Sequence, residues 1–245
     1  MQIFIDYEKT LVLNKKTISH QTIEMLKSIA KNNEVYILST STLFDVIKAF
    51  DFENIHIIST LENAVYFNNT ISFAKINFKT INDLLKNPSI YTAYTIVNHE
   101  TLIFKYQNRL KEFYPNQYLK LIDELTTDIS FIVIAINIDG YDSLVKNLNN
   151  LSYEVLGRDY KRVLLKITKT PSTKLDWLLK YKKSPTIGIG DSLFDYEFIK
   201  HCDYDVAMLD GDEELIKLCK YKTELPCKEN GALKFIINLL KHHSS

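Results

Sequence analysis

The chain has 245 residues, enough for one large domain or two modest ones around a substantial hydrophobic core. Its 30 lysines and arginines balance its 30 aspartates and glutamates, which excludes the global positive charge that recruits nucleic acid or an acidic membrane surface. The apolar stretches are too short to span a bilayer and the N-terminus lacks a signal-peptide pattern, so we expect a cytoplasmic protein without nucleic-acid or membrane partners.

The first predicted element is an apolar run that ends in two carboxylates. Residues 3–5 indicate the end of a buried strand, and Asp6 and Glu8 follow at its carboxyl end. Ligands bind at this edge of a parallel sheet, so the two side chains suit a shared reaction. An ordinary solvated turn explains the same residues, and this alternative stays open from the segment alone.

Helical and strand patterns then alternate. The predicted elements are a helix over 19–31, a strand over 35–38, a helix over 43–50, a strand over 55–59 and a hairpin of strands 64–67 and 70–73. Four hydroxyl residues, 39–42, follow the strand over 35–38. They either bind an anion or cap the helix that comes next.

From about residue 77 to 162 the pattern mixes short strands and helices. Strands are predicted over 94–97, 101–106 and 129–136, and helices over 80–85, 118–125 and 141–149. Such a mixture indicates an inserted α+β module. The three arginines of the chain, Arg109, Arg158 and Arg162, fall inside it or at its return, where they either bind planar anions or lie solvated.

The alternating pattern resumes after the insertion. The predicted elements are a strand over 163–167, a helix that starts within 170–174, strands over 186–190 and 205–208, and helices over 213–219 and 232–240. Asp191 and Asp195 end the strand over 186–190. Their spacing would place both on one helical face if a helix begins at once.

Carboxylates or hydroxyls thus follow three of the predicted strands, those that end at residues 5, 38 and 190. The carboxyl ends of parallel strands converge on one crevice, so these side chains are expected to share a site. The pattern resembles the haloacid dehalogenase superfamily, particularly its Cof-like sugar-phosphate phosphatases with a large α/β cap. The family's first motif, Asp-x-Asp-Gly-Thr-Leu, is matched by residues 6–11. Its second is matched by Thr40, its third by Lys174, and its fourth, Gly-Asp-x-x-x-Asp, by residues 190–195.

The resemblance implies an α/β fold in two parts. Residues 1–76 and 163–245 would form a Rossmann-like parallel-sheet core, and residues 77–162 an inserted α+β cap domain. The cap would close over the site and choose the substrate, with Arg109, Arg158 and Arg162 as candidates for contacting it.

The activity implied is that of a Mg2+-dependent phosphatase of small phosphorylated metabolites, most commonly sugar phosphates. Asp6 would attack the phosphoryl group to form an aspartyl-phosphate, and Glu8 would transfer protons. Thr40 and Lys174 would bind the phosphoryl oxygens. Mg2+ would be held by Asp6, the main-chain carbonyl of Glu8, Asp191 and Asp195.

Four departures from the family pattern bear on turnover. They are Glu8 in place of Asp, Lys9 in place of Gly, Ser41-Thr42 in place of Gly-Arg, and Phe194 in place of Asn. Glu8 keeps a carboxyl group but moves it by one methylene. Two alternatives therefore stay open: a catalytically weakened protein that binds a phosphorylated ligand or a partner, and a sugar phosphomutase on the same fold. In each case we expect a monomer or small homo-oligomer.

Overall fold

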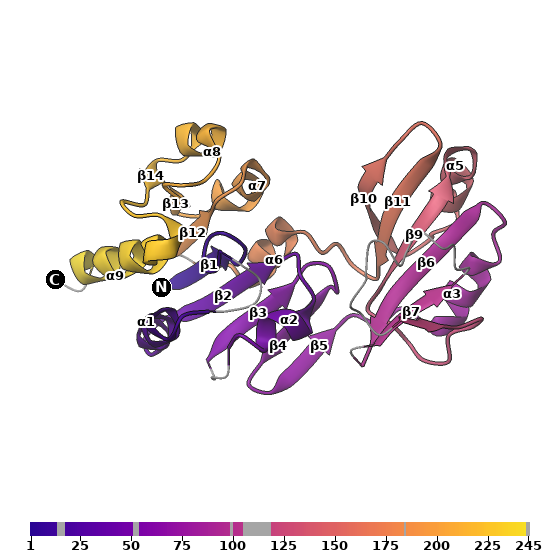
Figure 1. The fold of residues 1–245 in the computed structure, drawn as a ribbon, viewed down its shortest axis with the longest axis horizontal. Helices are drawn as coiled ribbons and strands as arrows, with labels where there is room; N and C mark the ends of the chain where they lie inside the picture. Colours follow the sequence, from indigo (N-terminus) through magenta and orange to yellow (C-terminus); the bar gives the residue numbers. More distant parts are fainter. Residues whose placement is uncertain (14–17, 51–53, 99, 105–118, 184, 244–245) are drawn as a thin grey trace. The chain divides into compact units, whose positions relative to one another are not determined.

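A computed structural model describes residues 1–13, 18–50, 54–98, 100–104, 119–183 and 185–243. The chain divides into two compact units, and its N-terminal and C-terminal parts share the first of them (Figure 1). The first unit comprises Met1–Thr60, Ala64–Ser72 and Ser172–Ser245, and the second comprises Leu61–Asn63 and Phe73–Pro171. None of the described helices is both long and apolar enough to cross a membrane.

The first unit is built on an eight-stranded sheet with the strand order β14-β13-β12-β1-β2-β3-β4-β5. The strands from β14 to β3 are parallel, and β4 runs antiparallel to β3. Their bounds are β1 (Gln2–Asp6), β2 (Glu34–Ser39), β3 (Ile55–Ser59), β4 (Ala64–Phe67), β5 (Thr70–Phe73), β12 (Thr186–Gly190), β13 (Tyr204–Ala207) and β14 (Tyr221–Lys222). The strand order reverses between β1 and β12, so these two strands flank the switch point at which α/β sheets bind ligands.

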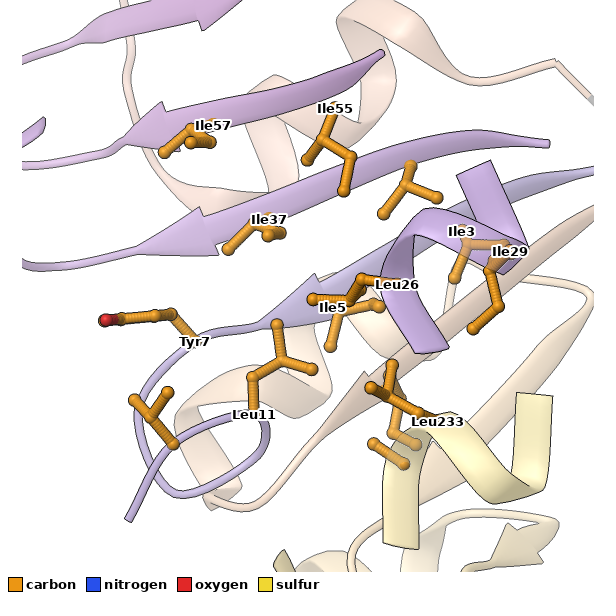
Figure 2. Close-up of a cluster of buried hydrophobic side chains, with 14 of the residues drawn as sticks. Ile3, Ile5, Tyr7, Leu11, Leu26, Ile29, Ile37, Ile55, Ile57 and Leu233 are labelled. Atoms are coloured by element: carbon orange, nitrogen blue, oxygen red, sulfur yellow. The ribbon is translucent and has the colours of Figure 1, made fainter. Parts of the chain in front are cut away.

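Helices cover both faces of this sheet, which explains why its central strands are apolar along their whole length. On one face, Leu26 and Ile29 of α1 and Leu233 of α9 pack over Ile3 and Ile5 of β1 (Figure 2). Each such buried side chain contributes about 1.5–3 kcal/mol to stability. The helices of this face are α1 (His20–Ala30), α2 (Leu43–Ile47) and α9 (Gly231–His243). Those of the other face are α6 (Lys174–Tyr181), α7 (Tyr196–Ile199) and α8 (Glu213–Leu218).

The second unit has a six-stranded sheet with the order β10-β11-β9-β6-β7-β8. Alternate residues of β9, Ile132, Ile134 and Ile136, pack against Ile81 of α3 and Leu144 of α5, so both helices cover the same face. The strands are β6 (Ile90–Val97), β7 (Glu100–Phe104), β8 (Leu119–Leu121), β9 (Phe131–Asn137), β10 (Ser152–Arg158) and β11 (Arg162–Thr168), and the helices are α3 (Phe78–Leu85) and α5 (Ile138–Lys146). This unit is the α+β insertion in the α/β chain.

The bounds of the two units differ from the expected division at 77 and 162. Strand β11 pairs antiparallel with β9 along its whole length and with β10 over Val163–Thr168, so the second unit continues to Pro171. An isolated bridge between Ile76 and Ile129 likewise ties the preceding segment to this unit. Pairing between strands thus sets both boundaries of the second unit. The spacing of apolar residues along the chain does not reveal such pairing.

The predicted helix over 118–125 is wrong where the structure describes it. Leu119–Leu121 form strand β8, which adds parallel to the edge of β7. Lys120 lies 4.0 Å from the Glu100 carboxylate across the pair, and Leu121 is 61% exposed, as suits an edge strand. Tertiary pairing overrides the weak local preference of so short a segment. Residue 118, and the end of the strand predicted over 101–106, lie outside the described residues.

A column of stacked rings runs across β2, β3 and β4. The His56 imidazole stacks between Tyr36, at 4.4 Å between ring centroids, and Phe67, at 3.9 Å. Tyr181 of α6 lies 5.8 Å from His56 at a tilted angle. Burial in this column lowers the pKa of His56, and the nearby Glu34 carboxylate offsets this only in part.

The free energy of unfolding is expected to fall as the pH is lowered through the titration of His56. Folding depresses the His56 pKa, so the unfolded chain binds the proton more tightly. Stability should therefore be full above the unfolded value of 6.5 and decline as the pH falls from there through the folded value. Urea midpoints at several pH values test this, with His56→Phe as the control that keeps the ring and removes its titration. An identical pH dependence in both proteins would contradict the expectation.

Candidate active site

Two neighbouring strand ends supply the first carboxylates of the site. Asp6 is the last residue of β1, and Asp191 directly follows β12, which pairs with β1 in parallel register. Both carboxylates therefore lie at the same edge of the sheet, at its switch point. Asp6 is 3% exposed and Asp191 9%, and few carboxylates are so buried without a partner or a function.

Asp195 reaches the site from a tight turn and not from a helical face. After Asp191 the chain forms a 3-10 turn, Leu193–Asp195, that folds the Asp195 carboxylate back. Its Oδ2 accepts hydrogen bonds from the main-chain N–H groups of Asp191 (3.2 Å) and Ser192 (3.1 Å) and from the Ser192 hydroxyl (3.1 Å). A Cβ at Gly190 would lie 2.7 Å from Asp195, so the close approach requires glycine there.

Lys174 connects the carboxylates of the two motifs. It is the first residue of α6, which begins with a capping box of Thr173 and Asp176. Its Nζ donates hydrogen bonds of 2.5 Å to Oδ1 of Asp6 and to Oδ1 of Asp195. Burial opposes the charged ammonium, but the two carboxylates outweigh it and hold the pKa of Lys174 above its usual value. Lys174 is thus a fixed positive charge within hydrogen-bond distance of Asp6.

The acidic cluster brings three carboxyl groups together beside the ammonium of Lys174. Asp6, Asp191 and Asp195 each offer an oxygen within 4.8 Å of the others. Burial raises the pKa of Asp6 well above its usual value, although Lys174 lowers it, and burial together with Asp195 raises the pKa of Asp191. A donor set of carboxylate oxygens alone fits a hard divalent cation such as Mg2+, which would relieve the repulsion among the three groups.

The Glu8 carboxyl group accepts hydrogen bonds from two serine hydroxyls, one on the last residue of β2 and one in the bend after it. Its Oε1 accepts hydrogen bonds from Ser39 Oγ (2.8 Å) and from Ser41 Oγ (2.5 Å), whereas Thr40 between them is exposed. The family motif points to Thr40 and does not include Ser39 or Ser41. Strand alternation does not reveal this pair, because β2 ends at Ser39 and Ser41 lies in the bend that follows it. Thr42, the last hydroxyl of the run, caps α2 and accepts a hydrogen bond from Asp45 N–H.

Lys9 occupies the position at which the family motif has glycine. Its φ is 59°, in the left-handed region, where side chains other than glycine cost about 1–2 kcal/mol. Its ammonium acts to lower the pKa of Asp191, against the effects of burial and Asp195. The backbone conformation of Lys9 therefore lowers stability, whereas its positive charge favours the ionised form of Asp191.

We expect Lys9→Gly to stabilise the protein by about 0.5–1 kcal/mol. Relief of the left-handed strain exceeds the extra entropy that glycine adds to the unfolded chain. Urea denaturation of wild type, Lys9→Gly and Lys9→Ala measures the effect. Lys9→Ala removes the charge and keeps the strain, so equal stability of the two variants would contradict this account.

The remaining predicted residues take no part in these hydrogen bonds or lie outside the described residues. Arg158 and Arg162 belong to the second unit, where the Arg158 guanidinium lies 5.8 Å from the Tyr141 ring and Arg162 pairs with Asp159 at 3.5 Å. Both are exposed, and Arg109 lies outside the described residues. Phe194, in the turn after β12, is 91% exposed.

The sequence pattern of the haloacid dehalogenase-like hydrolases matches residues 3–236 of the chain. No curated protein matches it in sequence. Many solved structures resemble it, and the following three are among those that do so over nearly their full length. A protein of Eubacterium rectale is 15% identical with a TM-score of 0.73, and 97% of this chain and 98% of that one are covered.

The other two structures are phosphatases of the same superfamily. BT1666 of Bacteroides thetaiotaomicron is 14% identical with a TM-score of 0.69, covering 97% of this chain and 94% of that one. The subclass IIB sugar phosphatase BT4131 is 16% identical with a TM-score of 0.61, covering 97% and 98%. At these identities the likeness establishes a shared fold, a Rossmann-like core with an inserted unit.

Proposed function

The chain belongs to the haloacid dehalogenase-like hydrolases, and from that premise we propose that it hydrolyses phosphate monoesters of small metabolites with the help of Mg2+. The observation that carries the proposal is the bridge from Lys174 to both Asp6 and Asp195 inside the acidic cluster. A buried nucleophile beside a fixed ammonium suits attack on an anionic phosphoryl group.

In the proposed reaction Asp6 attacks the phosphorus and the bond to the leaving oxygen breaks. Glu8 gives its proton to that oxygen, and the alcohol departs. Water then attacks the aspartyl-phosphate and transfers a proton to Glu8, which releases inorganic phosphate and restores both carboxyl groups. The position of Glu8, two residues beyond Asp6 at the same strand end, supports this division of roles.

Lys174 and Thr40 are the proposed donors to the phosphoryl oxygens. Their charge and hydroxyl would stabilise the loose transition state of phosphoryl transfer. Asp6, the main-chain carbonyl of Glu8, Asp191 and Asp195 are the proposed Mg2+ ligands. Bound Mg2+ supplies electrostatic stabilisation of the phosphoryl oxygens. The direct hydrogen bond from Lys174 supports a further role for Asp195 in orienting the ammonium.

We assign substrate choice to the second unit, acting as a cap domain. The candidates for contacting the substrate are Arg109, Arg158 and Arg162, and sugar phosphates are the favoured class. One of the similar structures, BT4131, is a sugar phosphatase, which supports this class. The proposal also includes a cytoplasmic location and action as a monomer or small homo-oligomer.

A screen of phosphorylated metabolites, with Mg2+ and with a chelator in its place, tests the proposal. We expect release of inorganic phosphate from at least one sugar phosphate with Mg2+, and its loss with the chelator. Absence of phosphate release from every ester would overturn the proposal. In that case ligand-induced thermal stabilisation would favour a binding protein, and conversion between phosphate positions of one sugar would favour a mutase.

A further inference from the structure

Glu8 lies in a hydrogen-bonded arrangement that neither the motif nor the family match describes. Both of its donors, the Ser39 and Ser41 hydroxyls, bind the same carboxylate oxygen, Oε1. Each such hydrogen bond favours the observed geometry by about 0.5–1.5 kcal/mol. This oxygen is therefore held at the end of β2, and the rest of the carboxyl group has a defined orientation.

The two hydroxyls are themselves fixed. Ser39 is fully buried and Ser41 is 5% exposed. Ser39 Oγ accepts a hydrogen bond of 2.9 Å from Ser41 N–H, so its own proton is directed to Glu8. The Ser41 carbonyl in turn accepts a hydrogen bond of 2.7 Å from the Ser59 hydroxyl at the end of β3. Ser39 is thus the last residue of β2, and the bend that carries Ser41 is hydrogen-bonded to the end of β3, so both donors are tied to the sheet.

We propose that Ser39 and Ser41 are positioning residues that hold Glu8 for proton transfer. We also propose that position 8 requires the length of a glutamate side chain for its carboxyl group to reach both hydroxyls. The inference rests on the proposed phosphatase function. The hydroxyls bind Oε1, and the proposal assigns the proton that reaches the leaving oxygen to Oε2. Neither serine gives up its proton in the reaction.

The length match follows from the geometry of the side chain. Aspartate at position 8 would withdraw the carboxylate by roughly 1.5 Å, one carbon–carbon bond, while the hydroxyls stay in place. It would lose both hydrogen bonds, and a misplacement of about 1 Å in a reacting group can cost on the order of a hundredfold in rate. Glu8→Asp should therefore slow this protein, although it restores the residue of the family motif.

The test compares kcat for two substrates in wild type, Ser39→Ala, Ser41→Ala and Glu8→Asp. A sugar phosphate needs its leaving oxygen protonated, whereas p-nitrophenyl phosphate has a leaving group that departs without a proton. We expect kcat for the sugar phosphate to fall about tenfold or more in each variant, with KM nearly unchanged. The fall should be smaller for the aryl phosphate.

Two controls separate positioning from a structural effect. Thr42→Ala removes a neighbouring hydroxyl that caps α2, so it should lower the urea midpoint and leave the ratio of the two rates unchanged. In a Glu8→Gln background, either serine substitution should cause little further loss, because residues that act as a unit are not additive.

Three results would overturn the inference. They are a Glu8→Asp variant faster than wild type, serine variants that lower both rates equally, and serine effects that persist in full without the Glu8 carboxylate. Each can occur while wild type remains an active phosphatase, so the proposed function survives them. A wild type that hydrolyses neither ester would overturn the proposed function and the inference together.

Discussion

We expect Asp6→Asn to lower kcat/KM for Mg2+-dependent phosphate release by at least about a thousandfold. The amide is nearly the same size as the carboxylate and still accepts a hydrogen bond from Lys174, so the fold should survive. It is a far weaker nucleophile, and it removes a negative charge from the cluster that would hold the cation. Initial rates with an aryl phosphate and with the best metabolite from the screen measure the loss.

Asp205→Asn is the matched control for this substitution. Asp205 is also a buried carboxylate of the first unit, 5% exposed on β13, and it accepts a hydrogen bond from Lys220 N–H. It belongs to neither the acidic cluster nor the proposed machinery, so its variant should keep the wild-type rate. Activity of Asp6→Asn near that of Asp205→Asn would contradict the assignment of the nucleophile.

Lys174→Met should lose both activity and stability. The methionine fills most of the space of the lysine stem but leaves Asp6 and Asp195 buried without their shared cation. Removing one partner of a buried ion pair costs about 3–5 kcal/mol, because the remaining charge stays desolvated. Urea denaturation measures the stability, and the phosphate-release assay should show a large loss because the fixed charge beside the phosphoryl site is gone.

Mg2+ and a second lysine provide the controls for Lys174→Met. Mg2+ should restore part of the lost stability, since a cation that binds only the folded state stabilises it. Lys180→Met, on the exposed side of the same helix, should change stability by less than about 1 kcal/mol. Equal stability of the two lysine variants would show that the bridge to Asp6 and Asp195 contributes little.

Much of the fold could be predicted from apolar runs and their spacing. The buried strands β1, β2 and β12 are nearly continuous apolar segments, and such segments are informative because both faces of a parallel sheet are covered. Strand β10 has no such pattern. It lies at the edge of the second sheet, mostly exposed and interrupted by an irregularity near Gly157, so little burial marks it in the sequence.

The start of α6 shows the limit of local signals. Pro171 suggests a helix start within 170–174, but the capping box of Thr173 and Asp176 begins the helix only at Lys174. This register matters for the site, because the first residue of the helix is the one that reaches Asp6 and Asp195.

In the site, the convergence of Asp6 and Asp191 follows from neighbouring strand ends that meet at one edge of a sheet. Two details could not be read in advance. The Asp195 carboxylate returns through a 3-10 turn whose close packing depends on Gly190. The partners of Glu8 depend on the bend after β2, in which Ser41 N–H donates to Ser39 Oγ and both hydroxyls reach the carboxyl group.

The most direct measurement of the central claim is a search for the covalent intermediate. Wild type is mixed with Mg2+ and a radiolabelled phosphate ester, quenched in acid during turnover and digested, and the labelled peptide is identified. The account predicts an acyl phosphate on Asp6 that is absent from Asp6→Asn. Phosphate release at the same rate without label on Asp6 would contradict it.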